Sequence, residues 1–329
     1  MKKYIVAGIL FAATMLVSCG GLQSFTFDQL YPAEVTFPEQ VRTVAVVNHT
    51  PAIPFPKKDL LTLGRLEGDG KVLSESLAGG LADSRYFHQV IISDSVITQE
   101  LTGGEILPQS VVDSLTRVLG VDMILSVDRI QLLTGKKEVY YPGLMAPFAA
   151  FDLKMRPVLR AYIPSRVMPV VIISKVDSLL WDLNPTLSDH DVVNEASQHT
   201  GFTLVNQLVP HWKSVERIYF DGGNPDMRDA AVSLREGDWQ EAGRLWKNLY
   251  DSLKKGKLKS RAAFNMALAC EVQGMMSEAV DWIEKAKSCA TKGSEEDRAA
   301  AFYATVLQER AKDFQLLNLQ MARFGNKFN

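Results

Sequence analysis

The sequence predicts an α/β domain with a mixed sheet, followed by an all-α domain. Short β-branched runs alternate with amphipathic helical segments through the first two thirds of the chain. All 14 prolines lie at or before Pro225, and none occurs in the last 104 residues. Because proline disrupts a helix interior, its disappearance marks the start of long helices. The turn-forming run Asp-Gly-Gly-Asn-Pro at 221–225 therefore separates an α/β domain at 41–222 from a helical domain at 226–329.

Composition limits the classes of function. The 329 residues carry 36 Lys+Arg and 38 Asp+Glu, a formal net charge of −2. This balance argues against a nucleic-acid-binding protein, which needs a marked excess of basic residues. Hydrophobic residues make up 47% of the chain, a share typical of folded globular proteins rather than disordered ones.

The first nineteen residues have the pattern of a secretory signal. Lys2 and Lys3 precede 14 uncharged residues, from Tyr4 to Val17. As a helix this run would be about 21 Å long, shorter than the ~30 Å hydrocarbon core of a bilayer. The pattern therefore predicts a signal peptide rather than a membrane-spanning helix. The run ends in Leu-Val-Ser-Cys, with the cysteine at position 19.

This ending resembles the lipobox of bacterial lipoproteins. The resemblance implies a signal peptide at 1–18, cleavage after Ser18 and attachment of a diacylglycerol to the thiol of Cys19. Acyl chains such as palmitate would then anchor the mature protein, since two or more chains hold a protein stably on a membrane. Residues 19–40 are expected to form a lipidated N-terminal linker. The other interpretation is an ordinary signal peptide with a cysteine near its end.

The residues after Cys19 bear on localisation. Gly20 rather than aspartate follows the cysteine, and residues 21–25 contain no acid. By resemblance to lipoprotein sorting in Gram-negative bacteria, the first feature implies the outer membrane. The second implies its periplasmic face.

The expected order of elements in the first domain is β-α-β-α-β-β-β-α. Strands are predicted where β-branched and apolar residues run together, and helices where apolar residues recur at helical spacing. Pro108 and Gly120 bracket one helix, while Ser188 and Asp191 form a capping box at the start of another. The predicted strands are 41–47, 88–93, 121–133, 153–163 and 167–181, with a further strand at 215–220, and the predicted helices are 71–84, 107–119 and 188–209.

Three runs resemble the small α/β domain of periplasmic lipoproteins such as the penicillin-binding-protein activators and the curli secretion factor. They are VRTVAVVNHT from Val41, LADSRYFHQVIISD from Leu81 and VVDSLTRVLGVDMILSVDRI from Val111. The resemblance is one of pattern and extends over about 41–212. It implies a non-catalytic domain that binds protein partners.

The helical domain contains a repeat with an offset of 37 residues. GDWQEAGRLWKNL begins at Gly237 and GMMSEAVDWIEKA begins at Gly274, each after a helix-forming run. A glycine at the turn and an alanine five residues later resemble the tetratricopeptide repeat, whose period is 34 residues. The resemblance implies a concave groove for a peptide or protein surface. Because three or more repeats are usual, the alternative is a helical appendage packed on the α/β domain.

The same repeat geometry bears on Cys270 and Cys289. An oxidising periplasm favours disulfides. In an antiparallel hairpin, however, the two cysteines lie at unequal distances from Gly274, a mismatch of about 16 Å along the helix axis. Since a disulfide needs Cα atoms within about 7 Å, both thiols are expected to be free.

Few residues suggest chemistry. The chain has no serine-hydrolase, zinc-protease or P-loop motif. The run GDGK at 68–71 opens a predicted helix and permits either anion binding or a plain turn and cap. Asp191, Glu195 and His199 recur every four residues on one helix face, which permits either a metal site or a solvated face with local ion pairs.

One uncharged run, VYYPGLMAPFAAF at 139–151, lies between two predicted strands. It is either an exposed apolar loop that meets a partner or the membrane, or a loop packed into its own domain. Its length and lack of alternation do not fit a barrel hairpin.

We therefore expect a lipid-anchored periplasmic adaptor or scaffold protein that is not an enzyme. Its expected partners are the membrane, through Cys19, and proteins of the envelope assembly or secretion machinery, without nucleic acid, cofactor or metal. The alternative is a ligand-binding or enzymatic α/β domain acting on an envelope polymer. That alternative requires carboxylates or histidines converging in a cleft.

Overall fold

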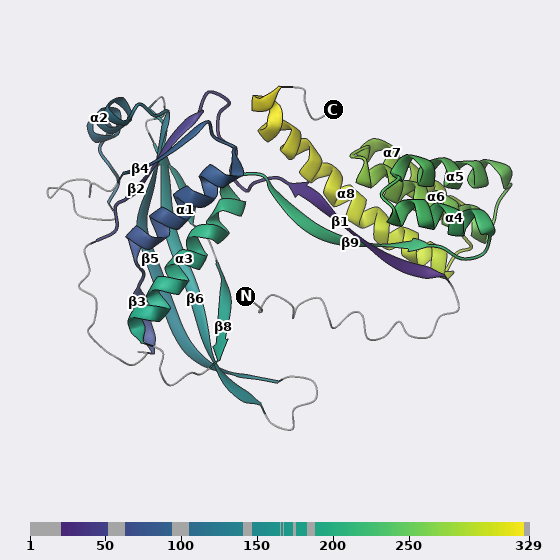
Figure 1. Cartoon of the computed structure of the whole chain (residues 1–329), viewed down its shortest axis with the longest axis horizontal. Coiled ribbons are helices and arrows are strands. Elements are labelled where there is room, and N and C mark those ends of the chain that lie inside the picture. Colours follow the sequence, from purple (N-terminus) through teal and green to yellow (C-terminus); the bar gives the residue numbers. More distant parts are fainter. Residues whose placement is uncertain are drawn as a thin grey trace. The chain divides into compact units, whose positions relative to one another are not determined.

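The computed structural model describes residues 21–51, 63–93, 105–140, 147–164, 166, 168–173, 176–182 and 188–325. Within them the chain forms an α/β unit and a helical unit (Figure 1). Of the described residues, the α/β unit contains those within 33–211 and 320–325, and the helical unit contains 21–32 and 212–319. The predicted fold class, a mixed α/β sheet domain followed by packed helices, is confirmed.

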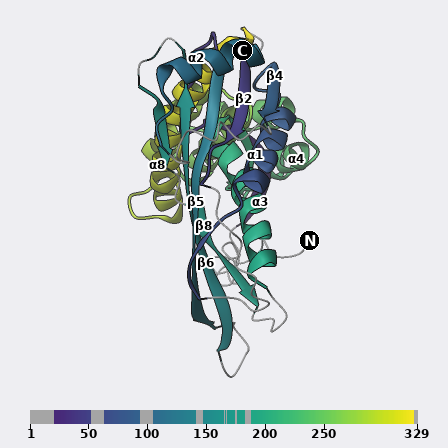
Figure 2. The ribbon, with the colours of Figure 1, turned by 90° about the vertical axis from the view of Figure 1, so that its left-hand side faces the viewer.

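A mixed seven-stranded sheet forms the centre of the α/β unit. Its strands are β2 (Thr43–Asn48), β3 (Gly64–Glu67), β4 (Gln89–Ser93), β5 (Met123–Val139), β6 (Phe148–Tyr162), β7 (Val170–Ile173) and β8 (Val176–Asp182). The order is β4-β2-β5-β6-β7, with β3 paired to β5 and β8 paired to β6. β2 is parallel to both β4 and β5, and β5 then forms a long antiparallel pair with β6 (Figure 2).

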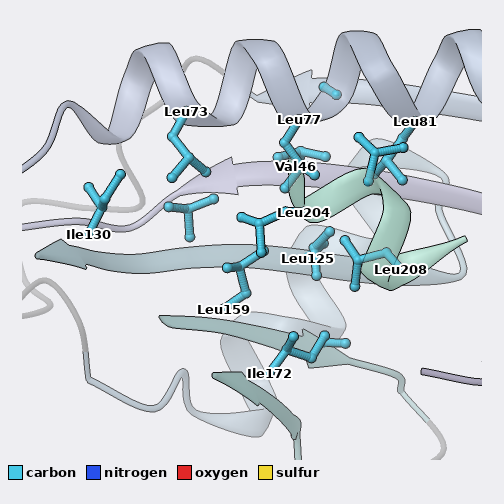
Figure 3. Packing of buried hydrophobic residues seen from close by; sticks show 14 of the residues in the cluster. Val46, Leu73, Leu77, Leu81, Leu125, Ile130, Leu159, Ile172, Leu204 and Leu208 are labelled. Carbon is cyan, nitrogen blue, oxygen red and sulfur yellow. The ribbon is translucent and has the colours of Figure 1, made fainter. Parts of the chain in front are cut away.

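Helices cover both faces of this sheet. α1 (Gly70–Ser84) and α3 (Asp189–Leu208) pack on one face, and α2 (Gln109–Leu119) packs on the other. Alternate residues of β2 point to opposite faces, so Val46 joins the core under α1 and α3 while Val47 joins the core under α2. Figure 3 shows the larger core, in which leucines of both helices meet sheet residues: Leu73, Leu77, Leu81, Leu204 and Leu208 against Val46, Leu125 and Leu159.

Most predicted elements of this unit are present, with two differences in extent. β5 and β6 continue well beyond the predicted strands 121–133 and 153–163. The single strand predicted at 167–181 is two strands, β7 and β8, which pair with different parts of β6. β3 was not predicted, because four residues give too short a pattern to recognise.

The helical unit consists of packed antiparallel helices. They are α4 (Pro225–Arg235), α5 (Trp239–Ser252), α6 (Lys257–Val272), α7 (Met276–Cys289) and α8 (Glu295–Met321). α4 packs against α5, α5 against α6, and α6 against α7. Gly237 and Gly274 end their helices with φ of +82° and +76°, which favours glycine. Ala242 and Ala279 are fully buried where the paired helices meet.

An unpredicted strand, β1 (Leu22–Tyr31), lies in the segment 19–40 that the sequence predicts to be a linker. It pairs with β9 (His211–Phe220) in a separate two-stranded sheet, here called the ribbon. The amide of Asp221 donates to the carbonyl of Gly21 (2.7 Å), so the strands run in opposite directions. The predicted strand 215–220 thus belongs to the helical unit rather than to the α/β domain, and the units divide at Trp212 rather than near residue 222.

The end of the chain belongs to the α/β unit, although the sequence assigns it to the helical domain 226–329. The side chain of Gln320 exchanges hydrogen bonds with the backbone of Ala33 (2.8 and 3.0 Å). The guanidinium of Arg323 lies 4.0 Å over the ring of Tyr86 and donates to the carbonyl of Val41 (3.2 Å). Among the described helices, none has the length and apolarity needed to cross a bilayer.

Candidate functional site

The ribbon is held on the helical unit mainly by α6. Asn265 is buried and uses both ends of its amide on one residue of β9, accepting from the amide of Phe220 (2.9 Å) and donating to its carbonyl (2.6 Å). The ring of Phe220 packs edge-on against Phe264, with centroids 5.2 Å apart. Asn265 therefore supplies the backbone partners that a neighbouring strand would otherwise provide.

A buried carboxylate joins both strands of the ribbon to α6 and α8. Glu271 accepts two hydrogen bonds from Arg217 of β9 (2.8 and 3.0 Å) and one from Gln29 of β1 (2.9 Å). The hydroxyl of Tyr303 in α8 donates to the same carboxylate (2.5 Å). Four side chains from four elements thus meet at one point, and the charge of Glu271 is compensated by Arg217.

This network shifts the protonation of its members. Burial alone would lower the pKa of Arg217, but the hydrogen bonds and charge of Glu271 outweigh it and hold that pKa above its usual value. Burial, reinforced by the nearby Glu271, raises the pKa of Tyr303 well above its usual value. Arg217 therefore stays charged and Tyr303 stays a hydrogen-bond donor.

Both ends of β1 make further contacts inside the helical unit. Phe25, near its start, packs edge-on against Trp239 of α5, with centroids 5.2 Å apart. At its far end, Arg310 of α8 donates to the carbonyl of Leu30 (2.7 Å) and lies over the ring of Tyr31 (4.8 Å). Burial lowers the pKa of Arg310. β1 is thus a fixed part of the helical unit along its whole length.

These contacts matter because of what precedes β1. Cys19, the predicted lipid-attachment residue, lies outside the described residues, and Leu22 starts β1 three residues after it. Part of the segment predicted as a lipidated linker is therefore a hydrogen-bonded strand, Leu22–Tyr31, in which Gln29 is the buried residue. Sequence reasoning missed this, although LQSFTFDQLY does alternate apolar and polar residues at its centre.

A second polar cluster lies in the α/β unit, at the carboxyl end of β2. Asp128 sits where the β5–β6 register shifts, between Val127 and Arg129. Its carboxylate accepts from Ser126 (2.6 Å) and from Arg160 of β6 (2.6 Å), and it lies 3.3 Å from Nδ1 of His49, the residue after β2. The shift in register aims this side chain at its partners, as bulges often do near functional sites.

The same cluster leaves one nitrogen available. An ionised carboxylate only accepts hydrogen bonds, so the contact with Asp128 suits a proton on Nδ1 of His49. Nε2 is buried and has no hydrogen-bond partner within the described ranges. The carboxyl ends of parallel strands are also where ligands bind in open α/β sheets. Sequence reasoning missed this cluster; its available signal was an aspartate inside a predicted buried strand.

The GDGK run at 68–71 is a cap, as one of the two sequence interpretations holds. The carboxylate of Asp69 accepts from the amides of Lys71 (2.9 Å) and Val72 (3.1 Å) and so occupies the helix N-terminus. A side chain at Gly70 would collide with Thr50 and Asn48, which explains the glycine by close packing.

The helix face with Asp191, Glu195 and His199 is spread along α3. Asp191 forms the predicted capping box with Ser188, and these hydrogen bonds lower its pKa. His199 is half-buried, and burial lowers its pKa. No set of three or more metal-ligating side chains occurs in the part of the chain that the structure describes.

The run at 139–151 joins β5 to β6. Its first residue, Val139, ends β5, and residues 148–151 begin β6, while residues 141–146 lie outside the described residues. Tyr140 is exposed. The strands thus extend into a run that the sequence analysis treats as a loop.

Both predicted free thiols are free in the structure. Cys270 is buried in α6, and burial raises its pKa to about 11. Cys289 is partly exposed at the end of α7. Cys270 therefore serves as a small apolar packing group.

The comparisons with known proteins give two family models and a distantly similar solved structure. The family model described as Domain of unknown function (DUF8603) matches residues 41–220, and that described as Domain of unknown function (DUF6340) matches residues 228–309. The PelC dodecamer from Paraburkholderia phytofirmans, solved as a variant, is similar at 12% identity with a TM-score of 0.27, covering 56% of this chain and 99% of that one. No curated protein matches. The model for DUF8603 spans more than half of the sequence, and the chain therefore belongs to the family Domain of unknown function (DUF8603).

Proposed function

We propose that this protein is a lipid-anchored adaptor of the bacterial cell envelope, attached to the outer membrane through Cys19 and facing the periplasm. Its α/β unit binds protein partners of envelope assembly or secretion and is not catalytic. Its helical hairpins are tetratricopeptide-like repeats that hold β1, the strand that follows the lipid-attachment residue.

The observation that carries this proposal is the attachment of β1 to the helical unit. A lipid on Cys19 would be followed almost at once by a strand fixed through Glu271 and Arg310. Such a connection holds the helical unit at the membrane surface instead of leaving it on a flexible tether. The similar backbone geometry of the two hairpins, with Gly237 and Gly274 at equivalent turns, supports the repeat assignment.

Under this proposal, the ribbon of the same chain occupies the surface of the repeats that would otherwise bind a partner. α6 is buried from Ser260 to Glu271, and its polar side chains bond to the ribbon. The helical unit then binds its own strand β1, and partners bind the surface of the α/β unit.

The test is the variant Cys19→Ser expressed in a Gram-negative host. We expect the wild type to carry a diacylglycerol mass on the Cys19 peptide and to fractionate with the outer membrane. The variant is expected to lose the lipid mass and to accumulate with its signal peptide uncleaved. A wild-type protein without lipid on Cys19 would refute the anchor.

A second candidate function rests on the cluster around Asp128. His49 offers a buried, oriented nitrogen, and carboxylate–histidine pairs of this kind serve as general bases or ligand contacts. This feature favours the alternative in which the α/β unit binds or acts on an envelope polymer. The check is the nitrogen NMR signal of the His49 imidazole with and without solubilised peptidoglycan fragments. A change at Nε2 in the wild type, together with weaker binding of the fragments by His49→Gln, would support this function over a purely protein-binding role.

A further inference from the structure

Two short segments of the helical domain are rich in lysine and free of acid. Residues 253–260 contain four lysines, and residues 285–292 contain three. Neither segment contains aspartate or glutamate, in a chain whose net charge is −2. We call their seven lysines the lysine-rich end: Lys254, Lys255, Lys257, Lys259, Lys285, Lys287 and Lys292.

The fold brings the two segments to the same end of the helical unit. The first segment connects α5 to α6, and the second covers the last turn of α7 and the turn after it. The hydroxyl of Ser260 in α6 donates to the carbonyl of Ala286 in α7 (2.7 Å), which places these antiparallel helix ends in contact.

Two aromatic side chains lie among these lysines. Tyr250 and Trp282 pack edge-on, with centroids 5.0 Å apart. Lys259 lies over the ring of Tyr250 and Lys285 over that of Trp282, both at 4.1 Å. Lysines with tyrosine and tryptophan are the side chains that favour the boundary between water and lipid.

The start of β1 lies at this end as well. Gly21 is hydrogen-bonded to Asp221, as described above, and the turn that follows approaches α6. A Cβ on Gly223 would lie 3.4 Å from Cδ1 of Leu258, which stands between two of the lysines. Cys19 is two residues before Gly21, a distance of about 7 Å in extended chain. A lipid on Cys19 would therefore enter the membrane beside the lysine-rich end.

Acids neutralise part of this charge. Lys257 pairs with Glu296 at 3.3 Å, and Lys287 approaches Glu284 at 4.0 Å. Arg261 nearby pairs with Glu295 and Glu296. Exposed lysines without an ion-pair partner among the described residues remain at positions 254, 255, 285 and 292.

We propose that the lysine-rich end rests on the anionic phospholipid headgroups of the membrane that holds Cys19. The proposal deepens the proposed function and depends on the lipid anchor. Each lysine close to an anionic membrane surface strengthens association about fivefold, and a basic patch next to a lipid chain is an effective second membrane signal. Headgroup phosphates match the lysine charge, and the lipid brings the patch within reach of them.

The experiment uses the lipidated full-length protein reconstituted into phosphatidylcholine vesicles with or without phosphatidylglycerol. Lysines are acetylated and their labelling rates are read by mass spectrometry. Lys254, Lys255 and Lys292 are expected to label about fivefold more slowly when phosphatidylglycerol is present. Lys136 and Lys154 of the α/β unit should label equally on both vesicles. The protection should disappear at about 1 M salt, where the screening length falls to ~3 Å.

Charge-removing variants supply the control. The combined change Lys254→Gln, Lys255→Gln and Lys292→Gln should abolish the protection of Lys285 and Lys287. The matched change Lys136→Gln, Lys137→Gln and Lys154→Gln removes the same charge from the α/β unit and should leave the protection intact. Equal loss in both variants would show a general charge effect and overturn the proposal.

The two proposals can fail separately. Absence of lipid mass on Cys19 refutes the anchor alone, and flotation of that protein with phosphatidylglycerol vesicles still tests the patch. Lipid on Cys19 with identical labelling on both vesicles refutes the membrane contact. Protection by an added acidic protein, with none by vesicles, would assign this end to a protein partner instead.

Discussion

Two buried carboxylates, Glu271 and Asp128, hold together side chains from elements that are distant in the sequence. Each is almost inaccessible to solvent and each is bonded to an arginine and to at least one neutral donor. A buried charge is tolerated only when it is paired and hydrogen-bonded in this way. Both residues therefore fix the position of the elements whose side chains they bind.

Removing Glu271 should be severely destabilising. In Glu271→Ala, Arg217 keeps its buried charge without a partner, at a cost of about 3–5 kcal/mol in the free energy of unfolding. Glu271→Gln should cost less because it keeps an oxygen for hydrogen bonding. Urea unfolding followed by circular dichroism measures the change. The control is Glu241→Ala, whose exposed pair with Arg244 should leave the midpoint nearly unchanged; similar midpoints for the two alanine variants would contradict the assignment.

The thiols give a second test at the residue scale. Cys270 is buried, with a pKa of about 11, whereas Cys289 is partly exposed. A thiolate is the reactive species, so a thiol reagent near neutral pH should modify Cys289 in the folded protein and spare Cys270. Denaturation should then reveal both. Two unreactive thiols after denaturation, joined in a crosslinked peptide, would show that the α6–α7 hairpin is wrong.

At the scale of elements, local patterns predict most of the α/β unit but not the ribbon. The helices begin and end near their capping residues, as Asp69 and Ser188 show, because caps are encoded within a few residues. β1 and β9 have weaker patterns of alternating apolar and polar residues, and most of the chain separates them in the sequence. The pairing of distant strands is not specified by either sequence alone, and the polar cluster of His49 and Asp128 depends on pairing of the same kind.

The ribbon should be needed for the stability of the helices. A fragment 226–329 lacks β1 and β9, so the buried faces of Phe264, Asn265 and Glu271 would meet water. We expect a helical circular dichroism spectrum, binding of a hydrophobic dye and a broad thermal transition. A fragment as cooperative as the same helices in the full chain, without dye binding, would show that the ribbon contributes little. A strand-rich spectrum would contradict the fold itself.

At the scale of the whole molecule, the chain passes between the two units three times. It crosses after Pro32, after His211 and after Leu319, so each unit is assembled from separate stretches of sequence. The proline distribution correctly indicates where the helices begin, but it contains no information on which segments return to which unit. The end of the chain shows this most clearly, since Gln320 and Arg323 are bonded within the α/β unit.

This interleaving predicts an unusual outcome for cleavage at the turn 221–226. Two domains that follow one another in the sequence and share only one linker would separate when that linker is cut. Here the amino-terminal piece keeps the ribbon, which packs on the helices, and the carboxyl-terminal piece keeps residues 320–325, which pack in the α/β unit. The two pieces should therefore elute together in native gel filtration and separate only in denaturant. The measurement needs a protease site placed in the turn, and the uncut protein is its size standard. Separation under native conditions would mean that these cross-packed segments contribute too little to hold the pieces together.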